Sequence, residues 1–158
     1  MRIREYSPAD KVQILQLHVE FEQEFSPDIY LENSLSTQSE LEERYTYFIH
    51  QEGQFWVMEE RGVVVGLIGV QLQENDRAEL IQLRVRKSHQ RRGIATLLIK
   101  KVEETALFHG KKQIYLQTAE PLIKARTLYG KLGYILENTS KFSGFTVMTY
   151  KKDLVTTK

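Results

Sequence analysis

The sequence predicts an α/β fold in which helices flank both faces of a mixed β-sheet. Its 158 residues suit one domain, and 41% hydrophobic with 27% charged residues is an ordinary globular composition. Apolar residues repeat with a helical period in some stretches and with a period of two in others. The resulting element order, β-α-α-β-β-β-α-β-α-β-β, distributes helices among the strands. We find no linker or repeat, so we expect a single domain over residues 1–158.

The first part of the chain predicts one strand and two helices. A short strand is expected at residues 3–6. Ser7 as N-cap and Pro8 at the first helical position begin a helix that we expect to end near Glu24. A capping-box pattern predicts a second helix over residues 37–49.

After Gly53 the apolar period changes and strands alternate with helices. The glycines at 93, 110 and 133 fall where helices should begin or end. The expected elements are strands at 55–59, 63–73 and 79–86, a helix from Gly93 to Gly110, a strand at 114–118, a helix at 122–133, and a hairpin of strands 134–138 and 145–150.

Composition excludes several kinds of chemistry. The chain has no cysteine, which excludes disulfides, thiolate metal sites and a cysteine nucleophile. The four histidines show no close metal-ligand spacing, so we expect no metal. No apolar run approaches the roughly 20 residues of a membrane span. Residues 1–5 lack the apolar stretch of a signal peptide, and we therefore expect a cytoplasmic protein.

Charge is unevenly distributed although the net charge is only +1. Residues 20–60 hold eleven Asp and Glu against one basic residue, and residues 80–102 hold seven Lys and Arg and no acid. Either these are solvated faces of opposite sign, or one segment serves a polyanion and the other a cation. Nucleic acid is not expected as a partner, because the basic run lacks interleaved aromatic residues and a known binding motif.

Residues 81–96 carry the most informative chemistry. They run from a strand through a basic turn into a helix, whose first turn offers free N–H groups and partial positive charge. Gly93 and Ala95 would let a ligand approach that backbone, and Arg91 and Arg92 add charge. This pattern indicates a phosphate or pyrophosphate site, although a plain strand–turn–helix junction would read similarly.

Two motifs resemble signatures of the Gcn5-related N-acetyltransferase (GNAT) family. Residues 90–95, Gln-Arg-Arg-Gly-Ile-Ala, are similar to the Gln/Arg-x-x-Gly-x-Gly/Ala signature, and residues 125–134 are similar to Ala-x-x-Leu-Tyr-x-Lys-x-Gly-Phe/Tyr. The resemblance implies a mostly antiparallel sheet of six to seven strands, splayed between strands 4 and 5 and flanked by about four helices. Two positions depart from the family pattern. Leu122 stands where Asn is usual, and Gly130 stands inside a helix where Glu is commoner, which we interpret as a close-packing point.

The resemblance also implies a site for acetyl-coenzyme A. The backbone of Leu83 and Val85 would meet the pantetheine arm and the thioester, and the turn would bind the pyrophosphate. The implied cofactor-binding residues are Leu83, Arg84, Val85, Gln90, Arg91, Arg92, Gly93, Ile94, Ala95, Thr96, Thr118, Leu128, Tyr129 and Lys131.

Two residues are candidates for proton transfer. Tyr129 matches the family's tyrosine, whose phenol would protonate the leaving thiolate; the alternative is a packing tyrosine. Glu79 begins the strand that leads to the turn, and by alternation it would share an apolar face with Ile81, Leu83 and Val85. Such a carboxylate would have a raised pKa that suits a base, unless it lies in solvent beside Arg77. Glu24, Tyr30 and Tyr45 are poorer candidates for the base.

The sequence therefore predicts an enzyme that moves an acetyl group from acetyl-coenzyme A to a primary amine by direct attack. The acid-rich segment 20–60 lies where the resemblance places the acceptor site, which favours a cationic small molecule. The alternatives are acetylation of a protein N-terminus or lysine, and a non-catalytic acyl-coenzyme A sensor. The C-terminal hairpin could be the edge of a homodimer.

Overall fold

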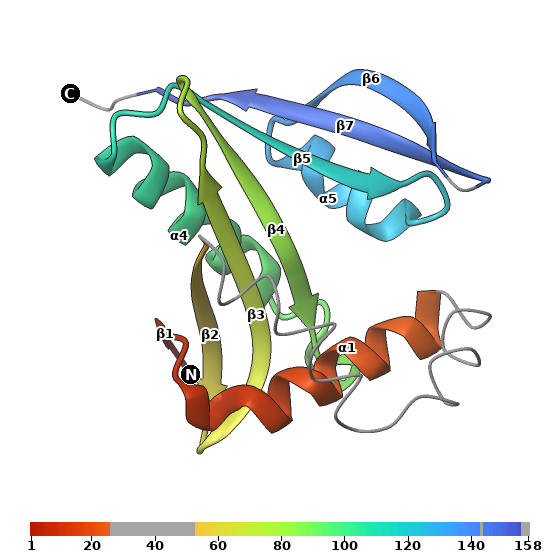
Figure 1. Cartoon of the computed structure of the whole chain (residues 1–158). Coiled ribbons are helices and arrows are strands. Elements are labelled where there is room, and N and C mark those ends of the chain that lie inside the picture. Colours follow the sequence, from red (N-terminus) through yellow and green to blue (C-terminus); the bar gives the residue numbers. More distant parts are fainter. Residues whose placement is uncertain (26–52, 143, 156–158) are drawn as a thin grey trace. The chain divides into compact units, whose positions relative to one another are not determined.

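Seven strands and their flanking helices make up the described part of the chain, residues 1–25, 53–142 and 144–155 of a computed structural model (Figure 1). The elements are β1 (Arg2–Glu5), η1 (Pro8–Asp10), α1 (Lys11–Phe25), β2 (Gln54–Glu60), β3 (Val63–Leu72), β4 (Arg77–Val85), η2 (Lys87–His89), α4 (Ile94–Phe108), β5 (Gln113–Ala119), α5 (Ile123–Lys131), β6 (Ile135–Phe142) and β7 (Phe145–Asp153). The elements of the described residues follow the expected order. The helix expected at residues 37–49 lies outside the described residues.

The strands form one mixed sheet in the order β1-β2-β3-β4-β5-β7-β6. β1 pairs with β2, and β7 with β5 and β6, in antiparallel fashion, whereas β4 and β5 are parallel. The β4–β5 register joins Arg77–Glu79 to Gln113–Tyr115, at the N-terminal ends of both strands, and gives no further pair among the described residues. The predicted mixed, mostly antiparallel sheet is thus confirmed, with a fourth and a fifth strand that pair at one end.

Contacts divide the chain into two compact units. The first comprises Met1–Gly69 and Gln82–Ile99, and the second comprises Val70–Ile81 and Lys100–Lys158. β3, β4 and α4 each run from one unit into the other. That residues 1–158 form one domain stays a prediction.

The core of the first unit fixes where α4 begins. Residues 55–58 of β2 are buried in succession, which requires cover on both faces of this strand. On β3, a Cβ added to Gly66 would lie 3.0 Å from Leu98 Cδ1 and 3.2 Å from Ile94 Cγ2. The absence of a side chain at Gly66 therefore lets the first turns of α4 lie close against β3.

The start of the first helix is held by a buried carboxylate. Ser7 is the expected N-cap and forms a capping box with Asp10 around η1, and Asp10 is 4% exposed. Arg4 donates to both carboxylate oxygens of Asp10, at 2.7 and 2.8 Å. The Arg4 hydrogen bonds, opposed by burial and helped by the Ser7 amide, hold the pKa of Asp10 below its usual value.

In the second unit, β7 lies between β5 and β6, with α5 beside them (Figure 1). The buried residues of this unit include Ile114 and Leu116 of β5 and Met148 and Tyr150 of β7. β6 is the edge strand, and its side chains from Ile135 to Lys141 are exposed.

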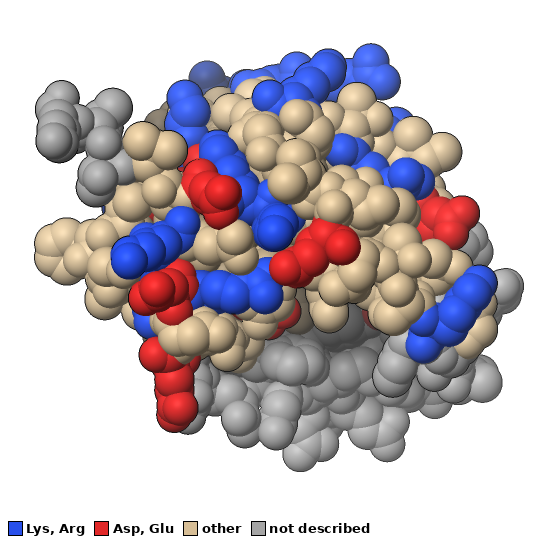
Figure 2. Space-filling view, turned by 90° about the horizontal axis from the view of Figure 1, so that it is seen from above, with Lys and Arg blue, Asp and Glu red and all other residues tan. Residues whose placement is uncertain are grey.

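Figure 2 shows basic side chains interspersed with acidic ones on the face that it presents, rather than a patch of one sign. None of the helices in the described ranges combines the length and apolar character that a membrane crossing needs.

Candidate active site

β4 changes character at Gln82. Up to Leu80 its residues alternate, with Ala78 and Leu80 buried and Glu79 half-buried between them, but from Ile81 onward every residue is half-buried. Gln82 has a φ of 58°, in the left-handed region that a non-glycine residue enters at a cost. The expectation that one alternating face continues through the whole strand is therefore wrong, because this residue interrupts the two-residue repeat.

The turn after β4 presents backbone amides. Arg91 and Gly93 both have positive φ, 63° and 80°, and a Cβ added to Gly93 would meet no atom within 4 Å. Leu97 N donates to Gly93 O at 3.1 Å, which makes Gly93 the N-cap of α4. The N–H groups of the next three residues have no acceptor within the helix. An open backbone at a positive helix end fits a pyrophosphate, so the residues present suit coenzyme A.

The basic side chains around this turn differ in what they contact. The Arg84 guanidinium lies 3.7 Å from the centroid of the Phe21 ring and donates to Leu83 O at 2.8 Å. Arg92 Nη2 donates to Glu60 Oε2 at 3.2 Å, and Arg91 is exposed.

Four acids of residues 20–60 contact basic or polar groups of the first compact unit. Glu60 contacts His89 as well as Arg92, and Glu59 pairs with Arg2 and Arg4. From α1, Glu20 pairs with Arg86, and Glu24 accepts from Gln90 Nε2 at 3.4 Å. Sequence reasoning missed these contacts, although the acid excess of one segment and the basic excess of the other were a signal that the two could pair. Six further acids of residues 20–60 lie outside the described residues.

Tyr129 lies in a cluster of three tyrosines in the second unit. It is 6% exposed, and its ring centroid lies 5.9 Å from that of Tyr134 and 6.4 Å from that of Tyr150. Tyr150 Oη accepts from Arg126 Nε at 3.2 Å. Tyr134 donates to Glu103, which also binds Lys152 at 2.9 Å. Burial, reinforced by Glu103, raises the pKa of Tyr134, so its phenol stays protonated. The ring of Tyr129 thus lies near two other tyrosine rings.

Glu79 lies near a polar group whose residues come from β4, β5 and β6. It is in register with Tyr115 of β5, and the Arg77 guanidinium lies 4.2 Å from the centroid of that tyrosine's ring. Arg77 also donates to Glu137 of β6 at 3.0 Å. Burial raises the pKa of Glu79, and Arg77 opposes that shift. A half-buried carboxylate with a raised pKa has the property that a general base needs. Of the poorer candidates for the base, Tyr30 and Tyr45 lie outside the described residues.

The remaining predicted residues follow the elements of the second unit. Thr118 of β5 is buried opposite Met148, Leu128 of α5 is half-buried, and Lys131 is exposed at the end of that helix. Leu122 is the N-cap of α5 and provides no side-chain hydrogen bond there. An Asn at this position would supply such a bond, so the departure from the family pattern costs the helix its cap.

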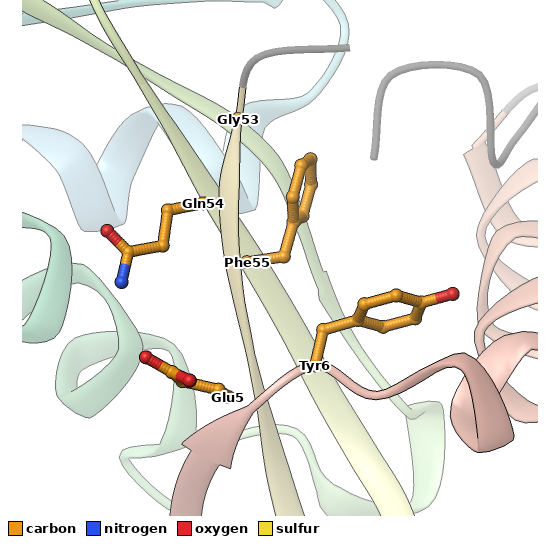
Figure 3. A pocket seen from close by; sticks show the side chains of 5 residues that line it. All are labelled: Glu5, Tyr6, Gly53, Gln54 and Phe55. Atoms are coloured by element: carbon orange, nitrogen blue, oxygen red, sulfur yellow. The ribbon is translucent and has the colours of Figure 1, made fainter. Parts of the chain in front are cut away.

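A separate hollow of about 220 Å³ lies in the first unit, where β1 ends and β2 begins. Figure 3 shows Tyr6 and Phe55 on one side, with Glu5 and Gln54 pointing the other way. None of the catalytic or cofactor-binding residues predicted from the sequence lines this hollow.

Comparison with known proteins supplies the family. The profile of the acetyltransferase (GNAT) family matches residues 14–134, which include both signatures and Glu79. This chain belongs to that family. The predicted family and GNAT fold are thereby confirmed for this acetyltransferase.

Individual relatives are more distant. A mouse protein, probable N-acetyltransferase family 8 member 5, is 30% identical over 109 residues, which are 65% of this chain and 47% of that protein. Human N-acetylaspartate synthetase is 33% identical over 107 residues, 66% of this chain and 35% of the enzyme. The chain thus spans less than half the length of these relatives. An aminoglycoside 6'-N-acetyltransferase solved with coenzyme A superimposes with a TM-score of 0.77 at 20% identity, covering 100% of this chain and 99% of that one.

Proposed function

We propose that this acetyltransferase moves the acetyl group of acetyl-coenzyme A to a primary amine by direct attack. The observation that carries the proposal is the open amide turn at Arg91–Gly93 that leads into α4. Its N–H groups would bind the pyrophosphate, and the backbone of Leu83 and Val85 would polarise the thioester carbonyl. The coenzyme A bound to a structural neighbour supports the same co-substrate.

The chemistry removes two protons from the ammonium nitrogen and supplies one to sulfur. Glu79 would take the first proton from the acceptor ammonium, directly or through water. The amine nitrogen then bonds to the acetyl carbon, and the carbon–sulfur bond breaks with its electron pair on sulfur. Tyr129 would donate its proton to that thiolate, and the second nitrogen proton, released as the amide forms, would return through water to the Tyr129 oxygen. Because the chain has no cysteine, an acetyl-cysteine intermediate cannot form.

The acceptor we propose is a cationic small amine. It is supported by the six acids of residues 20–60 that lie outside the described residues and by the aminoglycoside acetyltransferases among the structural neighbours. The relative named for N-acetylaspartate synthesis favours instead an amine that carries carboxylates.

A peptide acceptor, or an acyl-coenzyme A sensor without catalysis, would use the same cofactor turn. These functions are separated by a panel of cationic amines, carboxylate-bearing amines and peptides, each offered with acetyl-coenzyme A. The class that is acetylated fastest identifies the acceptor. A sensor would bind acetyl-coenzyme A and acetylate none of them.

The cofactor turn is tested by Gly93→Glu with Gly93→Gln as its control. A Cβ at this position meets no atom within 4 Å, and the two side chains have nearly the same shape and the same backbone cost at a φ of 80°, so they differ mainly in charge. The negative charge should weaken coenzyme A binding by at least about tenfold relative to Gln, which is 1.4 kcal/mol. Calorimetry on the folded variants gives both affinities, and equal values would refute the placement of the pyrophosphate.

A further inference from the structure

Two glutamates of α1, one helical turn apart, contact the turn that follows β4. The Glu20 carboxylate accepts a hydrogen bond from the Lys87 backbone N–H and lies 3.6 Å from Arg86 Nη1. Glu24 accepts from Gln90 Nε2 at 3.4 Å. Residues four apart lie on the same face of a helix, so one face of α1 reaches both ends of residues 86–90. Figure 1 shows α1 passing the C-terminal end of β4, where this turn begins.

Strand backbone holds the same turn through other bonds. Arg86 N donates to Val65 O at 2.8 Å, and Arg86 Nη2 donates to Val64 O at 2.9 Å. Gln90 Nε2 also reaches Val85 O at 3.3 Å. The start of the turn is therefore fixed by β3 and by Glu20 together. Residues 91–96, whose amides would bind the pyrophosphate, follow directly from this fixed segment.

We propose that Glu20 is a positioning residue for the coenzyme A turn, supported by Glu24 through Gln90. This inference rests on the proposed function. The direction in which coenzyme A affinity changes tests the proposal, because a carboxylate near a phosphate site repels the ligand. If charge alone mattered, removing Glu20 would tighten coenzyme A binding. If Glu20 holds the turn in place, removing it weakens binding despite the lost repulsion.

The experiment measures coenzyme A affinity by calorimetry, together with melting temperature, for the whole chain and three variants. Glu20→Ala removes the acceptor for the Lys87 amide, whereas Glu20→Gln keeps an oxygen there and loses the charge. Glu22→Ala is the control, since it removes a charge from the same helix about 200° away from Glu20 around the axis. The Glu20 side chain is 29% exposed, so these variants should fold.

Positioning predicts that Glu20→Ala weakens coenzyme A binding about tenfold, Glu20→Gln less, and Glu22→Ala by less than twofold. Melting temperatures should change little. Binding by Glu20→Ala that equals or exceeds that of the wild type would overturn the inference, as would a lower melting temperature with unchanged affinity. A wild-type chain that binds no coenzyme A would instead overturn the proposed function and this inference with it.

Discussion

Tyr129 is buried beside two other tyrosine rings, and an experiment can test its hydroxyl separately from its ring. The Tyr129 ring lies near those of Tyr134 and Tyr150, and the hydroxyls of both neighbours have polar partners of their own. Edge-on and tilted aromatic contacts of this kind stabilise a ring without involving its hydroxyl. A change confined to the oxygen should therefore leave the fold intact.

Tyr129→Phe should lower kcat by roughly 100-fold or more while KM for acetyl-coenzyme A changes little, because a proton donor to the thiolate is lost and the ring remains. A thiol reagent measures released coenzyme A cleanly, since the chain has no cysteine. Tyr150→Phe is the matched control, because it removes a hydroxyl that accepts from Arg126 in the same cluster. Parallel losses in both variants would indicate a packing role for Tyr129.

The residues that can be read from the sequence are those fixed by local chemistry. Gly93 and Arg91–Arg92 are visible because a helix start and its charges are local features. The φ of 58° at Gln82 is not visible, because no local preference makes Gln favour that conformation. Glu20 is also invisible as a residue of the site. Its partners Arg86 and Lys87 lie more than 60 residues away, and only the tertiary fold brings them to α1.

At the scale of elements, α5 is the helix with the weakest local support. Its N-cap Leu122 provides no side-chain hydrogen bond, and Gly130 lies in its last turn. The interpretation of Gly130 as a close-packing point is wrong. The residue is exposed, and a Cβ added there would meet no atom within 4 Å.

Gly130→Ala should raise the free energy of unfolding by roughly 0.5–1 kcal/mol, because Ala loses less backbone freedom than Gly in a helix. Gly133→Ala provides the contrast, since its φ of 94° disfavours any side chain and the change should destabilise. Denaturant unfolding of both variants measures the two effects. A loss of stability in Gly130→Ala would mean that the helix needs glycine there for a reason other than space.

Most elements are predictable because their boundaries are marked by caps and turns. The Arg61–Gly62 turn, for example, has φ values of 51° and 79°, as a tight hairpin between two strands requires. The end of the regular burial pattern in β4 is not predictable from the sequence, because apolar residues continue to alternate with polar ones past Gln82.

At the scale of the whole molecule, the charge asymmetry of the sequence is in part an internal pairing. Four acids of residues 20–60 contact basic or polar groups of the first unit, so they are not available to draw in an acceptor. The attraction of a cationic acceptor that we propose then rests mainly on the six acids outside the described residues. Attraction between charges in solvent acts over the Debye length and is weakened by salt.

With acetyl-coenzyme A saturating, kcat/KM for a cationic acceptor should fall clearly between about 20 and 200 mM salt, as the Debye length shrinks from roughly 20 Å to 7 Å. Saturation removes the salt dependence of coenzyme A binding from the measurement. A neutral amine of similar size is the control and should respond little. A best acceptor that carries carboxylates would contradict the cationic proposal and favour the chemistry named in the human relative.

His18 makes the stability of the first unit depend on pH. It is 1% exposed, and burial, reinforced by the Arg84 charge, lowers its pKa to about 3. In the unfolded chain the pKa returns to about 6.5, so between these values only the unfolded state binds the proton. The contribution of neutral His18 is therefore complete above pH 6.5 and declines as the pH falls, by about 2 kcal/mol at pH 5.

Denaturant unfolding at pH 7.5, 6 and 5 should show this decline in the wild type and a flatter profile in His18→Met, because Met cannot take up a proton. Paired carboxylates such as Asp10 have lowered pKa values, and their contribution is lost only at more acidic pH, below about 4. They therefore do not produce the decline between pH 6.5 and 5. Equal pH dependence in the two proteins would show that His18 is not the group whose protonation weakens the fold.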